Sequence, residues 1–126
     1  MTKGAVQPWA VGLTGLLLAA AALGYFLSPS GMLSVVGIDA TAETSFLVRT
    51  LASAFVAMLP MAWAVRRRSS DAAGRAILAG LAAYMFASSA VDLHAYFVGL
   101  VGQPALPSAG ARILLGLVLA WLVPGE

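Results

Sequence analysis

Four long apolar stretches run through this chain, and they limit the folds open to it more than any other feature. They cover residues 9–27, 44–65, 76–100 and 109–123. A helix needs roughly 20 mostly apolar residues to cross the hydrocarbon layer of a membrane. Because lipid offers the backbone no hydrogen-bond partners, such stretches cross it as helices. The sequence therefore predicts an all-α fold, a transmembrane four-helix bundle in a single domain over residues 1–126.

The composition agrees with a membrane chain. Hydrophobic residues make up 61% and charged residues 10%, whereas soluble domains are usually about 45–50% apolar and about 25% charged. The chain has no cysteine and one histidine, His94, which excludes disulfides and thiolate chemistry and leaves no cluster of metal ligands. The net charge of +2 gives no reason to expect nucleic acid. We therefore expect no metal and no cofactor, and membrane lipid as a partner.

The basic residues gather on one side of the predicted spans, before the first span and between the second and third. They are Lys3, Arg66, Arg67, Arg68 and Arg75. Loops rich in Arg and Lys remain in the cytoplasm, and such a cluster also attracts anionic lipids. The pattern predicts cytoplasmic termini.

Three tryptophans support this orientation. Trp9, Trp63 and Trp121 all fall at the cytoplasmic ends of the predicted spans, and tryptophan collects at membrane interfaces. The first span has a second interpretation, a cleaved signal peptide, because Lys3 precedes an apolar run that contains small residues at positions 20–22. The length of the run favours a retained helix.

Ionisable side chains within the spans are the candidate functional residues. Arg49, Asp92 and Arg112 lie roughly 5–12 Å from the outer boundary, at a helical rise of about 1.5 Å per residue. Such charges cost several kcal/mol unless they are paired or wetted. We expect Arg112 to extend to the outer headgroups, and His94 to have an interfacial or packing role.

Spacing selects the residues that share a face with Asp92. Ser88 and Tyr96 stand four residues to either side of it, so the three lie on one face of a helix. A similar polar stripe on the second span predicts an ion pair between Arg49 and Asp92. The predicted ligand-binding residues are Arg49, Ser88, Asp92 and Tyr96. Whether the pair only fixes the register of two helices or acts in binding stays open, and no catalytic residue is assigned.

Residues 28–43, between the first two spans, are too apolar for an ordinary linker. They predict either a loop along the outer membrane surface or a lid above the layer that contains Arg49. Thr41 or Thr44 is expected to cap the next helix, with Glu43 near its positive end.

Short motifs along the chain add a family resemblance. They are Pro29-Ser30-Gly31, Gly37-Ile38-Asp39, Arg49, the basic inner turn, Arg75 and Asp92. In their order they resemble the small four-helix bacterial membrane proteins of the DoxX-like families. That resemblance implies a multi-pass protein of the bacterial inner membrane that is sometimes an accessory to quinone-linked redox chemistry, and it assigns no reaction.

Three functions compete at this point. The first is binding of an apolar or amphiphilic molecule, such as a lipid, quinone or isoprenoid, near the outer leaflet. The second is a structural or accessory role, as a homo-oligomer or in a larger membrane complex. The third is transport or intramembrane catalysis through Asp92, which no nucleotide loop and no nucleophile–base set supports.

Overall fold

The chain folds into four long helices and one short one, seen in a computed structural model that describes residues 2–66 and 71–123. The helices are α1 (Lys3–Leu27), α2 (Pro29–Val35), α3 (Ala42–Val65), α4 (Ala72–Phe97) and α5 (Ala105–Leu122). The described residues form no strand, so the all-α prediction is confirmed. The four long helices are long and apolar enough to cross a membrane, which indicates a small membrane protein. Arg67 and Arg68 lie outside the described residues.

The helix boundaries show what the sequence pattern locates well and what it does not. α1 begins at Lys3, six residues before the predicted span, so Pro8 lies inside the helix. Thr41 caps α3 as predicted: its hydroxyl accepts a hydrogen bond from the Thr44 amide, and the Thr44 hydroxyl accepts one from the Thr41 amide. This reciprocal pairing is a capping box, which satisfies amide groups that the first turn leaves free.

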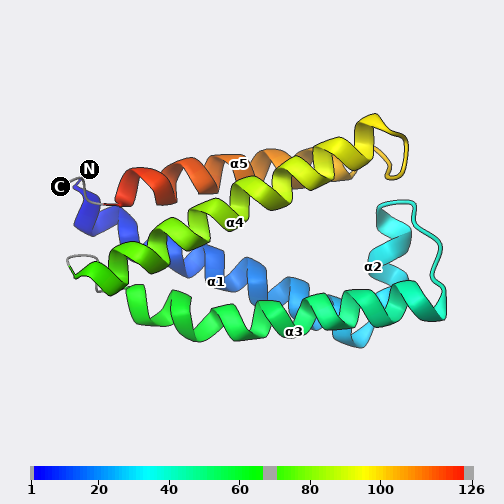
Figure 1. The fold of residues 1–126 in the computed structure, drawn as a ribbon, viewed down its shortest axis with the longest axis horizontal. Coiled ribbons are helices and arrows are strands. Elements are labelled where there is room, and N and C mark those ends of the chain that lie inside the picture. The colour runs from blue at the N-terminus through cyan, green and yellow to red at the C-terminus, as the bar shows by residue number, and fades with distance from the viewer. Residues whose placement is uncertain (1, 67–70, 124–126) are drawn as a thin grey trace.

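The long helices associate as two pairs, α1 with α3 and α4 with α5. Figure 1 shows both ends of the chain at one end of the bundle, where the pairs come together. From there the pairs diverge toward the opposite end, which carries α2. We call these the termini end and the α2 end.

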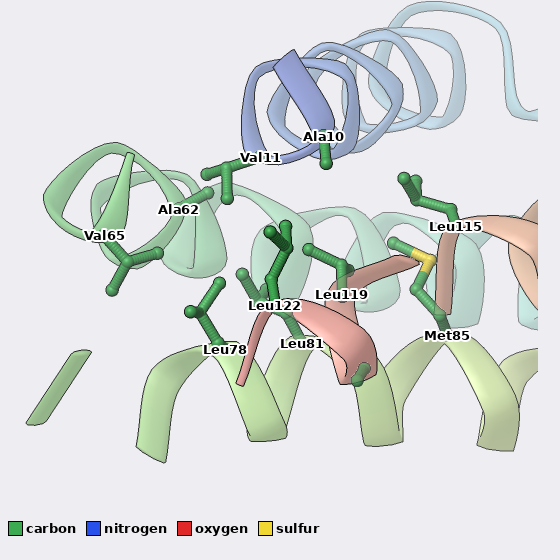
Figure 2. Close-up of a cluster of buried hydrophobic side chains, with 11 residues drawn as sticks. Ala10, Val11, Ala62, Val65, Leu78, Leu81, Met85, Leu115, Leu119 and Leu122 are labelled. Atoms are coloured by element: carbon green, nitrogen blue, oxygen red, sulfur yellow. The ribbon is translucent and has the colours of Figure 1, made fainter. Parts of the chain in front are cut away.

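A single apolar core joins all four long helices at the termini end (Figure 2). Its most deeply buried members include Leu78 of α4 and Leu119 of α5, each 0% exposed, and Val11 of α1 and Val65 of α3, each 1% exposed. The side-chain amide nitrogen Nε2 of Gln7 donates a hydrogen bond to the backbone carbonyl of Val65 at 2.6 Å. That bond satisfies a carbonyl which the end of α3 leaves free, so polar and apolar contacts together fix this end.

Two glycine turns shape the α2 end. Gly37 and Gly99 have positive φ angles of 80° and 76°, and each ends a helix with the paired backbone bonds of a Schellman motif. The loops that follow them meet, because the amide of Gly102 donates to the carbonyl of Val36 at 2.9 Å. The loop after α2 is thus tied to the loop between α4 and α5.

Candidate functional site

An ion pair inside the membrane-spanning region is the centre of the candidate site. Nη1 of Arg112 lies 2.8 Å from Oδ2 of Asp92, and the side chains are 31% and 28% exposed. Asp92 stands five residues before the end of α4 and Arg112 seven residues after the start of α5. At about 1.5 Å per residue both lie roughly 7–10 Å from the helix ends at the α2 end.

The ion pair joins α4 to α5. Steps of four residues lead from Asp92 along α4 to Ser88 and then to Tyr84, about 12 Å closer to the termini end. The ring of Tyr84 packs edge-on against Phe55 of α3, with 6.0 Å between ring centroids. Phe55 in turn contacts Tyr25 of α1 at 6.3 Å. Three aromatic rings therefore connect α1, α3 and α4 on the side of the ion pair toward the termini.

Close contact between α4 and α5 holds the two charged residues in register. Gly116 lies against Met85 and Phe86, so that an added Cβ would stand 3.1 Å from Cε1 of Phe86. The hydroxyl of Ser89 donates to the carbonyl of Met85 at 2.7 Å and contacts that of Ala109 at 3.2 Å. The short side chains on α5 let the helices approach closely, which membrane helices need because lipid supplies no hydrophobic drive between them.

The predicted pair of Arg49 and Asp92 was wrong. Asp92 pairs with Arg112 instead, and Arg49 is exposed without an ion pair to any described residue. The physical reason is the divergence of the helix pairs: α3 and α4 separate toward the α2 end (Figure 1), whereas α4 and α5 stay packed along their lengths.

The other candidate residues spread over the same part of α4. Ser88 shares the face of Asp92 and donates its hydroxyl to the carbonyl of Met85 at 3.1 Å. Tyr96 packs its ring edge-on against Phe97, with centroids 5.8 Å apart. His94 is exposed, on another face. Of the four predicted residues, the structure pairs only Asp92 with another charged side chain, and that side chain belongs to Arg112.

The sequence points to Arg112 through its distance from the turn between α4 and α5. Asp92 and Arg112 are each ten residues from Gly102, in the turn between α4 and α5. In an antiparallel pair of helices, residues equally far from the turn lie at similar depth. Arg49 and Asp92 are less symmetric about the connection between the end of α3 at Val65 and the start of α4 at Ala72. Depth in the membrane, taken alone, does not decide which of the two arginines pairs with Asp92.

No protein-family model, curated protein or solved structure matches this chain. Among residues 2–66 and 71–123 no three His, Cys, Asp or Glu side chains lie close enough together to hold a metal ion. The candidate site is thus defined by its own geometry. One carboxylate and one guanidinium, both partly exposed, lie between apolar helices, and three connected aromatic rings lie about two helical turns closer to the termini.

Proposed function

We propose that this small membrane protein binds an apolar or amphiphilic molecule, such as a lipid, quinone or isoprenoid, between its two helix pairs at the α2 end. The Asp92–Arg112 ion pair carries the proposal. A single hydrogen bond, at 2.8 Å, joins the two side chains, and no other described residue hydrogen-bonds to either. Oδ1 of Asp92 and most of the guanidinium donors therefore remain for a polar group of a ligand.

The surroundings of the ion pair suit a ligand of this kind. Binding sites for small molecules are mostly apolar and contain a few convergent polar groups that fix orientation. Here Tyr25, Phe55 and Tyr84 supply apolar surface on the side toward the termini. The joined loops at Val36 and Gly102 lie on the opposite side, in the position expected of a lid.

The orientation of the protein belongs to the same proposal. The positive-inside rule places the termini end, with Lys3, Arg66 and Arg75, in the cytoplasm of a bacterial cell, and the α2 end with its ligand at the outer leaflet. A reporter fused after Glu126 is expected to be cytoplasmic, and one inserted at Gln103 external. A fusion after Glu126 that is active only outside the cell would contradict the proposed orientation.

Membership of the DoxX-like families is part of this proposal and rests on the short motifs alone.

Ligand retention tests the binding function directly. Mass spectrometry of gently purified protein should find one apolar or amphiphilic molecule per chain, and Asp92→Asn should lower its occupancy. Asp39→Asn is the matched control, because it removes the same charge from an exposed residue at the same end. Equal retention in both variants would show that Asp92 does not hold the ligand, and a chain without bound molecules would contradict the function.

Arg49 favours a second candidate function, an accessory subunit or homo-oligomer. This arginine is exposed about 10 Å from the start of α3, and no described residue pairs with it. A carboxylate from another chain would stabilise such an intramembrane charge. The candidate predicts that Arg49→Leu lowers the fraction of cross-linked oligomer or of co-purified partner, while Arg75→Leu leaves it unchanged. A chain that stays monomeric in the membrane, without a partner, would exclude this role.

A further inference from the structure

A groove of about 1010 Å³ runs between α1 and α3 toward the termini end, away from the ion pair. Small residues of α1 make room for it, namely Gly12, Gly15 and Ala19. The rest of its lining is apolar except for one charged residue, Arg66. We call this surface the α1–α3 groove. Its chemistry is that of a long apolar trough with a positive charge at one end.

The length of the α1–α3 groove matches one leaflet of a bilayer. On α3 it extends from Val56 to Arg66, which is about 15 Å at 1.5 Å per residue. Half of a hydrocarbon layer about 30 Å thick is also about 15 Å. The groove therefore extends from the membrane interface to about the bilayer midplane, as one acyl chain of a lipid does.

Two tryptophans place the charged end of the groove at the interface. Trp9 and Trp63 line it, and they are 78% and 74% exposed. Large amphipathic rings of this kind lie at the level of lipid headgroups. The guanidinium carbon of Arg66 lies 5.7 Å from the ring centroid of Trp63. Arg66 and the headgroups of the adjacent leaflet therefore share one level.

The Arg66 side chain lies back along the groove instead of extending away from the membrane. Gln7 of α1 contacts the end of α3 at Val65, and Gly12 is five residues, or about 7.5 Å, deeper. Nε of Arg66 nevertheless lies 4.0 Å from the point where a Cβ on Gly12 would stand. Among the described residues this Nε is buried without a hydrogen-bond partner. Buried donors without a partner are rare in native structures, so this nitrogen marks Arg66 as the polar end of the groove.

We propose that the α1–α3 groove binds an anionic phospholipid of the surrounding leaflet. One acyl chain lies along the small residues of α1, and the phosphate accepts hydrogen bonds from the guanidinium of Arg66. Arginine matches phosphate in charge and geometry, since its planar fork can donate two parallel bonds. The site is separate from the ion pair of Asp92 and does not depend on the function proposed for it.

Lipid titration with native mass spectrometry tests the charge. The full chain is expected to retain phosphatidylglycerol in preference to phosphatidylcholine. Arg66→Gln should weaken phosphatidylglycerol retention about fivefold, the effect of one basic residue near an anionic surface. It should weaken phosphatidylcholine retention less, because the choline cation offsets the charge of the same phosphate group. Arg66→Lys should restore part of the loss. Arg75→Gln is the matched control, because Arg75 lies in the first turn of α4 and does not line the groove.

A second pair of variants tests the groove itself and decides the matter if Arg66→Gln does not fold. Gly12→Leu fills the groove and should reduce retention of phosphatidylglycerol. Gly110→Leu adds the same side chain on α5, where a Cβ meets no atom within 4 Å, and should have no effect. Three results would overturn the proposal: equal losses for Arg66→Gln and Arg75→Gln, no effect of Gly12→Leu, or a stable dimer that retains no phospholipid. Asp92→Asn should leave this lipid bound, so the two proposals fail separately.

Discussion

The two ends of the bundle are built on different principles. At the termini end all four long helices share one apolar core, with several side chains fully buried. At the α2 end the second apolar cluster takes its buried residues from α1 and α3 alone: Leu18, Ala22, Ala52 and Phe55. α4 contributes only the partly buried Tyr84 to it, and the ion pair lies beyond.

The difference shows how a very small bundle can hold charges within its membrane span. Close packing at one end fixes the positions of the helices, because interiors at crystal-like density resist displacement. The other end is then free to diverge and to keep Asp92 and Arg112 partly exposed. A chain packed equally tightly along its whole length would have to bury both charges, at a desolvation cost that often exceeds the attraction between them.

The largest expected effect contrasts the same substitution at two glycines of α5. Gly116→Leu forces a side chain into Met85 and Phe86, whose atoms already stand 3.1–3.3 Å from an added Cβ. We expect a loss of about 3 kcal/mol in the free energy of unfolding, as overpacked cores show. Gly110→Leu, in open space near the α2 end, should change it little. Unfolding in mild detergent with added dodecyl sulfate measures both, and similar losses would mean that the ends are packed alike.

A smaller effect is expected at the ion pair. Removing Arg112 alone leaves Asp92 as an unpaired intramembrane charge, which we expect to destabilise the fold by about 2 kcal/mol because the site is only partly buried. Arg112→Ala combined with Asp92→Ala should cost less than the sum of the single changes. Arg49→Ala combined with Asp92→Ala should be additive. Coupling to Arg49 in place of Arg112 would contradict the observed pairing.

The smallest effect compares one hydrogen bond at each end. Gln7→Ala leaves the buried carbonyl of Val65 without its partner and should cost about 1 kcal/mol. Gly102→Pro removes the donor to Val36 at the exposed loops and should cost less, while opening the loop after α2. Gly102→Ala keeps the amide and is its control. Hydrogen exchange of residues 36–41 reports that opening, and unchanged protection in Gly102→Pro would show that this bond does not hold the loops together.

The local structure could be predicted from the sequence because it depends on short-range chemistry. Long apolar runs must become helices in lipid, and the Thr41 cap follows from a hydroxyl before a helical run. The apolar segment 28–43 is a short helix, α2, followed by a turn at Gly37. Its composition marked it as more than a linker, but the seven residues of α2 are too few to show a helical period.

The pairing of the helices was decided only by the tertiary structure. Arg49, Asp92 and Arg112 stand at similar depths, so depth and face spacing fit either arginine as the partner of Asp92. Arg112 is the partner because small residues such as Gly116 of α5 pack against α4. The sequence alone does not reveal these contacts, because many Ala and Gly positions in this chain fit them equally well. Arg66 is the same kind of case. Its place in a basic segment was evident from the sequence, but its position against Gly12 depends on how α1 and α3 are packed.

Sequence determines which segments enter the membrane, because that depends on the transfer of each segment into lipid. The contacts among those segments depend on shape complementarity between whole helices, which only the folded bundle contains.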